Sequence, residues 1–180
     1  MSQATAFDVP TREHVSEKNQ AVFDKLTKSL GMVPNIYATL AHSDSALGDF
    51  LTFDHRKTSL SPKEREVVNL VTSEINGCSY CLAAHTMIGQ KVGFSADEVL
   101  KLRRGRATFD PKLDALAQFV HSVVENRGRV SDLDTATLMD AGYTEESVVD
   151  IVLSVVAIMT TNYLHNITDV PVDFPAAPAI

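Results

Sequence analysis

The sequence has only two cysteines and no tryptophan among its 180 residues. Such sparse cysteine, in a chain without a secretion signal, argues against a structural disulfide framework. Residues 1–10 have neither a basic start nor an apolar core, so we expect no signal or transit peptide and a cytoplasmic protein. The strongest apolar run, residues 148–159, is interrupted by Asp150 and is far shorter than the roughly 20 residues that span a bilayer. We therefore expect a buried helix there and no membrane segment.

Positive charge is also scarce. Sixteen Lys and Arg residues stand against 23 Asp and Glu residues, which gives a net charge of -7 and argues against general binding to nucleic acids or anionic membranes. One basic cluster, Lys101, Arg103, Arg104 and Arg106, ends a helical pattern at the point where cations favour the helix dipole. We interpret this cluster as a solvated helix end rather than an anion site.

No segment alternates apolar and polar residues between paired turn signals, so we predict essentially no β-sheet. Helix starts are marked instead, by Ser61-Pro62 with Glu64 as a capping box and by Asp110-Pro111. Apolar residues recur at steps of three and four over 110–127 and more loosely over 11–30, while the run 148–164 is too long for a strand. We predict an all-α fold of about seven or eight helices, with one domain over residues 1–168. An extended C-terminal tail follows over residues 169–180, which contain three of the seven prolines.

The chemical signal is the segment Gly77-Cys78-Ser79-Tyr80-Cys81-Leu82-Ala83-Ala84-His85. If a helix begins at about Cys78, steps of three to Cys81 and four to His85 place these side chains on one face. Two cysteines three apart in a helix have Cα atoms roughly 5 to 5.5 Å apart, which a disulfide permits. The pair can therefore switch between dithiol and disulfide. The helix start and the imidazole favour thiolate, and on the helix start alone Cys78 has the lower pKa.

Other kinds of cysteine site have sequence requirements that can be compared with this segment. A c-type haem site needs histidine directly after the second cysteine, where this sequence has Leu82. Zinc needs four ligands, whereas only Cys78, Cys81 and His85 stand at usual spacing, so we expect no metal. A thioredoxin-like site needs a βαβ context that we do not find. Two inert, buried cysteines with a hydrogen-bonded histidine are the structural alternative.

The preceding helix offers a carboxylate. On its helical wheel Glu74 falls inside the apolar stripe and Glu66 lies at the border. A carboxylate near the thiols would be partly desolvated, so its pKa would rise and it could accept a proton near neutral pH. A solvated or paired glutamate is the alternative for each. Late in the last helix Asn162, His165 and Asn166 form a polar stripe that suits either a pocket lining or a capping network.

The spacing Glu66-(eleven residues)-Cys78-x-x-Cys81-x-x-x-His85, within a core motif over residues 61–104, resembles the alkylhydroperoxidase D and carboxymuconolactone decarboxylase superfamily. Residues 31–37 and the ending Asp173-Phe174-Pro175 resemble its peroxidase-related branch. The resemblance implies an all-α fold, homo-oligomers that are often trimers or hexamers, and a peroxidase that uses no haem, metal or other cofactor.

The resemblance also implies residue roles. Cys81 would attack an organic hydroperoxide, Cys78 would resolve the sulfenic acid to a disulfide, and His85 and Glu66 would relay the proton. An external thiol or dithiol reductant would then restore the thiols. Glu74 stays a second candidate for the carboxylate. Tyr80 stands where the best-known peroxidase members have a further histidine, and it would either donate a hydrogen bond or fill space.

Two other functions stay open. A cofactor-free decarboxylase or isomerase would use His85 and Glu66 as acid and base, although classical decarboxylase members lack the cysteine pair. A redox-sensing helical binding module would use the cysteines only to report oxidation.

Overall fold

The computed structural model describes residues 7–180, so the expectation that residues 1–10 form no targeting segment falls largely outside the described range. Within that range the chain forms one short 3-10 helix and nine α-helices, with no strand. Eight of the nine α-helices are longer than six residues, which confirms the predicted all-α fold. The elements are η1 (Arg12–His14), α1 (Glu17–Leu30), α2 (Asn35–Leu40), α3 (Ala46–Asp54), α4 (Pro62–Ile75), α5 (Ser79–Lys91), α6 (Ala96–Arg103), α7 (Pro111–Glu125), α8 (Asp132–Asp140) and α9 (Glu145–Thr168).

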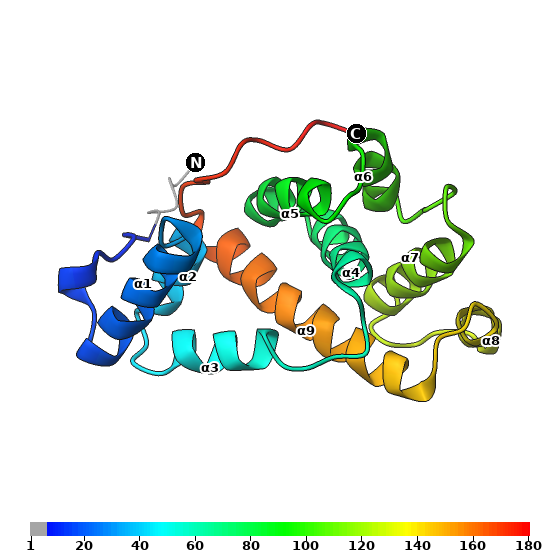
Figure 1. The fold of residues 1–180 in the computed structure, drawn as a ribbon, viewed down its shortest axis with the longest axis horizontal. Coiled ribbons are helices and arrows are strands. Elements are labelled where there is room, and N and C mark those ends of the chain that lie inside the picture. Colours follow the sequence, from blue (N-terminus) through cyan, green and yellow to red (C-terminus); the bar gives the residue numbers. More distant parts are fainter. Residues whose placement is uncertain (1–6) are drawn as a thin grey trace.

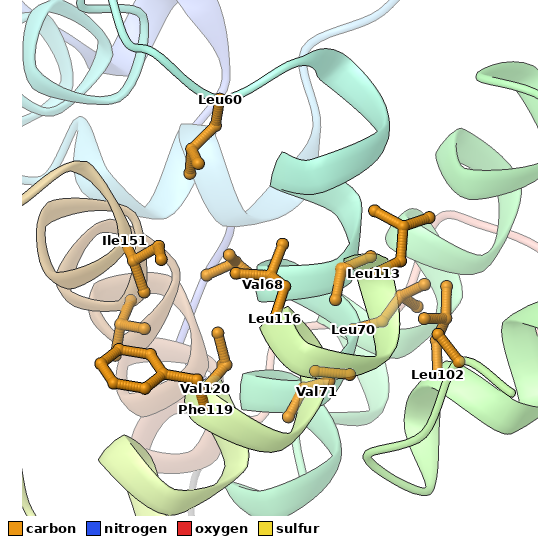
Figure 2. Close-up of a cluster of buried hydrophobic side chains, with 14 of the residues drawn as sticks. Leu60, Val68, Leu70, Val71, Leu102, Leu113, Leu116, Phe119, Val120 and Ile151 are labelled. Carbon is orange, nitrogen blue, oxygen red and sulfur yellow. The ribbon is translucent and has the colours of Figure 1, made fainter. Parts of the chain in front are cut away.

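Helices α4 and α9 form the centre of the bundle (Figure 1). Helix α4 packs against α5, α6, α7 and α9, while α1, α2 and α3 gather at one end of α9. The main hydrophobic core lies between α4 and α7, where Val68 and Val71 of α4 face Leu116 and Val120 of α7 (Figure 2). Because α4 is surrounded, eight of its fourteen residues are buried.

Both predicted N-terminal caps are present. Ser61 and Glu64 close a capping box at the start of α4, and the Asp110 carboxylate accepts the N–H groups of Lys112 and Leu113 at the start of α7. These caps satisfy backbone donors that have no partner inside the helix.

Helix α9 is longer than the apolar run in the sequence indicated. It has 24 residues and a mean hydropathy of 1.7 in its most apolar window, enough by length and composition to cross a membrane. The apolar run 148–159 is shorter than α9 because polar residues such as Asn162 and His165 continue the same helix beyond the run. These polar side chains are buried against other helices, so this face of α9 is packed into the bundle.

The C-terminal tail, residues 169–180, leaves α9 near α2 and runs past α5 to α6 without helical structure (Figure 1). Its path explains why the predicted solvated helix end is wrong for Arg103. That side chain is buried, since it donates to Glu74 Oε2 over 2.6 Å and to the Pro178 carbonyl oxygen over 2.5 Å. Arg106 pairs with Asp114 over 2.9 Å on the surface.

Candidate active site

The cysteine pair lies at the first turn of α5, where the sequence predicted a helix start. Cys78 is the N-cap, and its Sγ accepts the backbone N–H of Cys81 over 3.1 Å. The residue before it, Gly77, has φ +64°, a left-handed conformation that glycine adopts without strain. This turn between α4 and α5 therefore sets where Cys78 enters the helix.

Cys78 and Cys81 are joined by a disulfide, with their Cα atoms 5.4 Å apart. The side chains are deeply placed, because Cys78 is 0% and Cys81 3% exposed. Sγ of Cys81 lies 3.8 Å from Oγ1 of Thr161 in α9. Since Thr161 donates its own proton to the Ile158 carbonyl oxygen, its oxygen is free to accept from the thiol of the reduced form.

The buried Glu66 of α4 pairs with the partly buried His85 of α5. His85 Nδ1 lies 2.8 Å from Glu66 Oε2, and Glu66 Oε1 accepts the side-chain amide of Asn69 over 2.9 Å. Burial lowers the pKa of His85, but the charge of Glu66 and its hydrogen bond outweigh burial, so the pKa is raised above the usual value. His85 stands four residues after Cys81 in α5, on the same helix face. Because Nδ1 is held by Glu66, Nε2 is the nitrogen available for proton exchange.

Glu74, the carboxylate that the helical wheel favoured, has a different partner. It pairs with Arg103 over 2.6 Å and lies outside the contacts of His85. The wheel misled because it assumes one buried face, whereas α4 packs against four other helices and buries Glu66 as well. Of the two candidates, the structure thus brings only Glu66 to the histidine.

Tyr80 lies in a second, separate network. Its buried hydroxyl donates to Asp173 Oδ1 over 2.5 Å and accepts the backbone N–H of Ile36 over 3.3 Å. Burial and the hydrogen bond to Asp173 raise the pKa of Tyr80 well above its usual value. Sequence spacing does not predict the Asp173 contact, although the Asp173-Phe174-Pro175 ending belongs to the pattern that resembles the peroxidase-related branch. Tyr80 therefore connects the segment between the cysteines to the C-terminal tail.

The polar stripe of α9 holds the turn between α4 and α5. Asn162 accepts from the side chain of Asn76 over 2.9 Å and donates to Ser73 Oγ over 3.1 Å. Asn166 donates to the backbone carbonyl of Asn76 over 2.8 Å. Two residues of the stripe thus form a network that fixes the approach to Cys78. The third, His165, places its ring against that of Tyr80, with centroids 5.4 Å apart.

Helix α5 therefore carries two groups that could take part in a reaction. The cysteine pair lies at its first turn, and a histidine paired with a carboxylate lies one turn later. Residues 7–180 contain no group of three or more His, Cys, Asp or Glu side chains that could hold a metal ion. The arrangement suits two-electron thiol chemistry with a proton donor alongside.

Comparison with known proteins agrees with this fold. The model of the carboxymuconolactone decarboxylase family matches residues 42–110, which include α4, α5 and the site residues Glu66, Cys78, Cys81 and His85. An uncharacterized peroxidase-related protein from Silicibacter sp. TM1040 superposes with a TM-score of 0.80 and 24% identity, over 97% of this chain and 93% of that one. An uncharacterized peroxidase-related protein from Ralstonia eutropha JMP134, described as an alkylhydroperoxidase AhpD core, has a TM-score of 0.81 and 23% identity, over 92% and 90% of the two chains.

A more distant similarity links the fold to another activity. The debrominase Bmp8, in a variant bound to 2,3,4-tribromopyrrole, has a TM-score of 0.74 and 16% identity over 96% of this chain and 92% of that one. No curated protein matches the sequence. Residues 42–110 thus match the carboxymuconolactone decarboxylase family, and the chain as a whole shares the fold of the alkylhydroperoxidase AhpD core and of the other peroxidase-related structure.

Proposed function

We propose that this chain is a thiol-dependent peroxidase that reduces organic hydroperoxides through Cys78 and Cys81. The observation that carries the proposal is the position of the cysteine pair, one helical turn from a histidine that is paired with a buried carboxylate. The raised pKa of His85 keeps more of the imidazole protonated near neutral pH, and a positive charge on the same face favours the thiolate of Cys81.

In the first step the Cys81 thiolate attacks the outer oxygen of the hydroperoxide. The S–O bond forms as the O–O bond breaks, sulfur is oxidised to sulfenic acid, and the leaving alkoxide takes a proton from His85 to become an alcohol. Glu66 holds His85 by Nδ1 and stabilises the protonated ring. We assign the attack to Cys81 because it lies one helical turn before His85, on the same face of α5.

In the second step Cys78 attacks the sulfur of Cys81. The S–S bond forms, the S–O bond breaks, and the hydroxyl group leaves with one proton as water. Cys78 at the N-cap is suited to this step, because the N–H of Cys81 stabilises its thiolate. Two equivalents of an external thiol, or one dithiol, then return the disulfide to the dithiol. A cytoplasmic location, where such reductants are maintained, fits this cycle.

The active form in this proposal is a homo-oligomer, either trimer or hexamer. The support is a row of exposed apolar side chains along α9, spaced by three, four and seven residues: Val149, Val152, Val156, Tyr163 and Ile167. An exposed apolar row of this length is typical of a surface that another chain covers.

The test is peroxide oxidation of the reduced protein followed by thiol titration and mass measurement. One equivalent of cumene hydroperoxide should remove both thiols with a loss of about 2 mass units, the signature of a disulfide. Cys81→Ser should abolish turnover, whereas Cys78→Ser should gain one oxygen on Cys81. Unchanged thiols after treatment would contradict the proposal.

The same variants separate the alternatives. Activity on a non-peroxide substrate that survives replacement of both cysteines would select the decarboxylase or isomerase function, with His85 and Glu66 as acid and base. Thiols that oxidise slowly, together with a ligand retained through purification, would select the redox-sensing module.

A further inference from the structure

The C-terminal tail packs against the apolar cluster that contains the disulfide. Val170 is buried in the same apolar cluster as Cys78, Tyr80 and Cys81. Phe174 packs against this cluster, and its ring meets that of Tyr80 edge to face with centroids 5.5 Å apart. Figure 1 shows the tail running past α5, the helix that carries both cysteines.

One carboxylate fastens the tail to both α2 and α5. Asp173 Oδ1 accepts the Tyr80 hydroxyl over 2.5 Å, and Asp173 Oδ2 accepts the backbone N–H of Asn35 over 2.8 Å. Hydrogen bonds to a charged acceptor are stronger than those between neutral groups, and both of these lie at a partly buried site. Tyr80 is thus held from two sides, since it also accepts from Ile36 N.

Two more contacts anchor the tail on either side of Asp173. Asn35 Nδ2 donates to the Pro171 carbonyl oxygen over 2.9 Å, and Arg103 donates to that of Pro178 over 2.5 Å. Arg103 also donates to Glu74, so this carboxylate helps to position the arginine that binds the tail. The tail is therefore anchored at three points along its length: Pro171, Asp173 and Pro178.

This enclosure has a chemical consequence. Thiol–disulfide exchange requires a thiolate to contact one sulfur of the disulfide, but Cys78 is 0% and Cys81 3% exposed. We infer that the C-terminal tail is a strap that limits access of external reductants to the Cys78–Cys81 disulfide, and that Tyr80 and Asp173 are positioning residues that hold it closed. The inference rests on the proposed function only for the use of this step in turnover.

The test measures reduction of the oxidised full-length protein by excess dithiothreitol, with thiols counted by mass after acid quench and alkylation. The first thiolate of dithiothreitol attacks one sulfur and releases the other as thiolate. Its second thiolate then displaces the mixed disulfide, which leaves cyclic oxidised dithiothreitol and two protein thiols. Because no peroxide is present, the rate is independent of whether the chain is a peroxidase.

Asp173→Ala removes the hydrogen bonds of Asp173 to Tyr80 and to Asn35. It should speed reduction of the disulfide by about tenfold, a change that corresponds to about 1.4 kcal/mol. Tyr80→Phe keeps the ring but removes the hydroxyl, so it should also speed reduction. The matched control is Asp169→Asn, the same loss of charge at an exposed position of the same tail, and its rate should stay within about twofold of the wild type.

A second control separates strap opening from general loss of stability. Leu138→Ala weakens the main core at α8, which lies away from the tail in Figure 1, and its reduction rate should equal that of the wild type at a temperature where the variant is folded. Equal rates for Asp173→Ala, Tyr80→Phe and wild type would overturn the inference. So would a rate for Leu138→Ala as high as that for Asp173→Ala.

Discussion

Helices α4 and α5 begin with the same kind of contact but with different chemistry. At α4, Ser61 Oγ accepts the N–H of Glu64 over 3.3 Å, and Glu64 Oε2 accepts the N–H of Ser61 over 2.8 Å. At α5, Cys78 Sγ accepts the N–H of Cys81 over 3.1 Å, but the third residue is itself a cysteine and cannot return the contact. Sulfur is also the weaker acceptor.

The difference shows how a reactive helix start can be kept in place. The first turn of α4 is held by its own side chains, whereas that of α5 is held from outside: Asn162 of α9 binds the preceding turn, and Asp173 of the tail binds Tyr80. The α5 start therefore carries the Cys78–Cys81 disulfide while distant parts of the chain hold its first turn in place.

The largest expected effect comes from removing one member of the pair that joins these two helices. His85→Ala leaves the Glu66 carboxylate buried without its cationic partner, and we expect the free energy of unfolding to fall by about 3 kcal/mol. Urea unfolding of the reduced protein measures this change. His55→Ala, at an exposed histidine, should have little effect. Equal losses for the two variants would show that the Glu66–His85 pair does not join α4 to α5 as described.

Much of the fold was predictable because it depends on local signals. The caps at Ser61 and Asp110 and the helix start at Cys78 follow from side chains within a few residues of the helix they begin. The family spacing named Glu66 and His85, but periodicity alone preferred Glu74. A helical wheel does not show that several helices surround α4. Nor does it show that Arg103, which also binds the tail, pairs with Glu74.

The strap was not predictable from local pattern. Tyr80 and Asp173 are 93 residues apart, and nothing near either residue specifies the other as partner. Likewise, Arg103 belongs to a basic run that is typical of a solvated helix end, but contacts with Glu74 and with Pro178 of the tail accompany its burial. Contacts of this kind depend on tertiary packing.

The capping comparison itself is tested by changing the acceptor in each helix. Ser61→Ala should lower the free energy of unfolding by about 1 kcal/mol, because the α4 box loses its hydroxyl. In the reduced protein Cys78→Ser keeps a cap, so its unfolding free energy should change by no more than about 0.5 kcal/mol. Both follow from urea titrations with reductant present. A larger loss for Cys78→Ser than for Ser61→Ala would mean that the sulfur contributes more than capping.

A smaller effect is expected from pH. The pKa of His85 is raised in the folded state, so its pairing stabilises the protein fully below the unfolded histidine pKa of about 6.5 and less as pH rises through the folded value. Over that interval the folded protein binds more protons, and its stability should fall with increasing pH. His85→Ala should lack this decline. A decline of the same size in both proteins would assign it to other groups.

The most direct test of the central claim, that Glu66 acts through His85 to favour the Cys81 thiolate, is the pH dependence of the Cys81 reaction rate with hydroperoxide in the Cys78→Ser protein, with and without Glu66→Gln. Loss of the Glu66 charge lowers the pKa of His85, so less positive charge faces the sulfur. The account predicts that Glu66→Gln moves the midpoint of the rate profile to higher pH. The same midpoint in both proteins would contradict it.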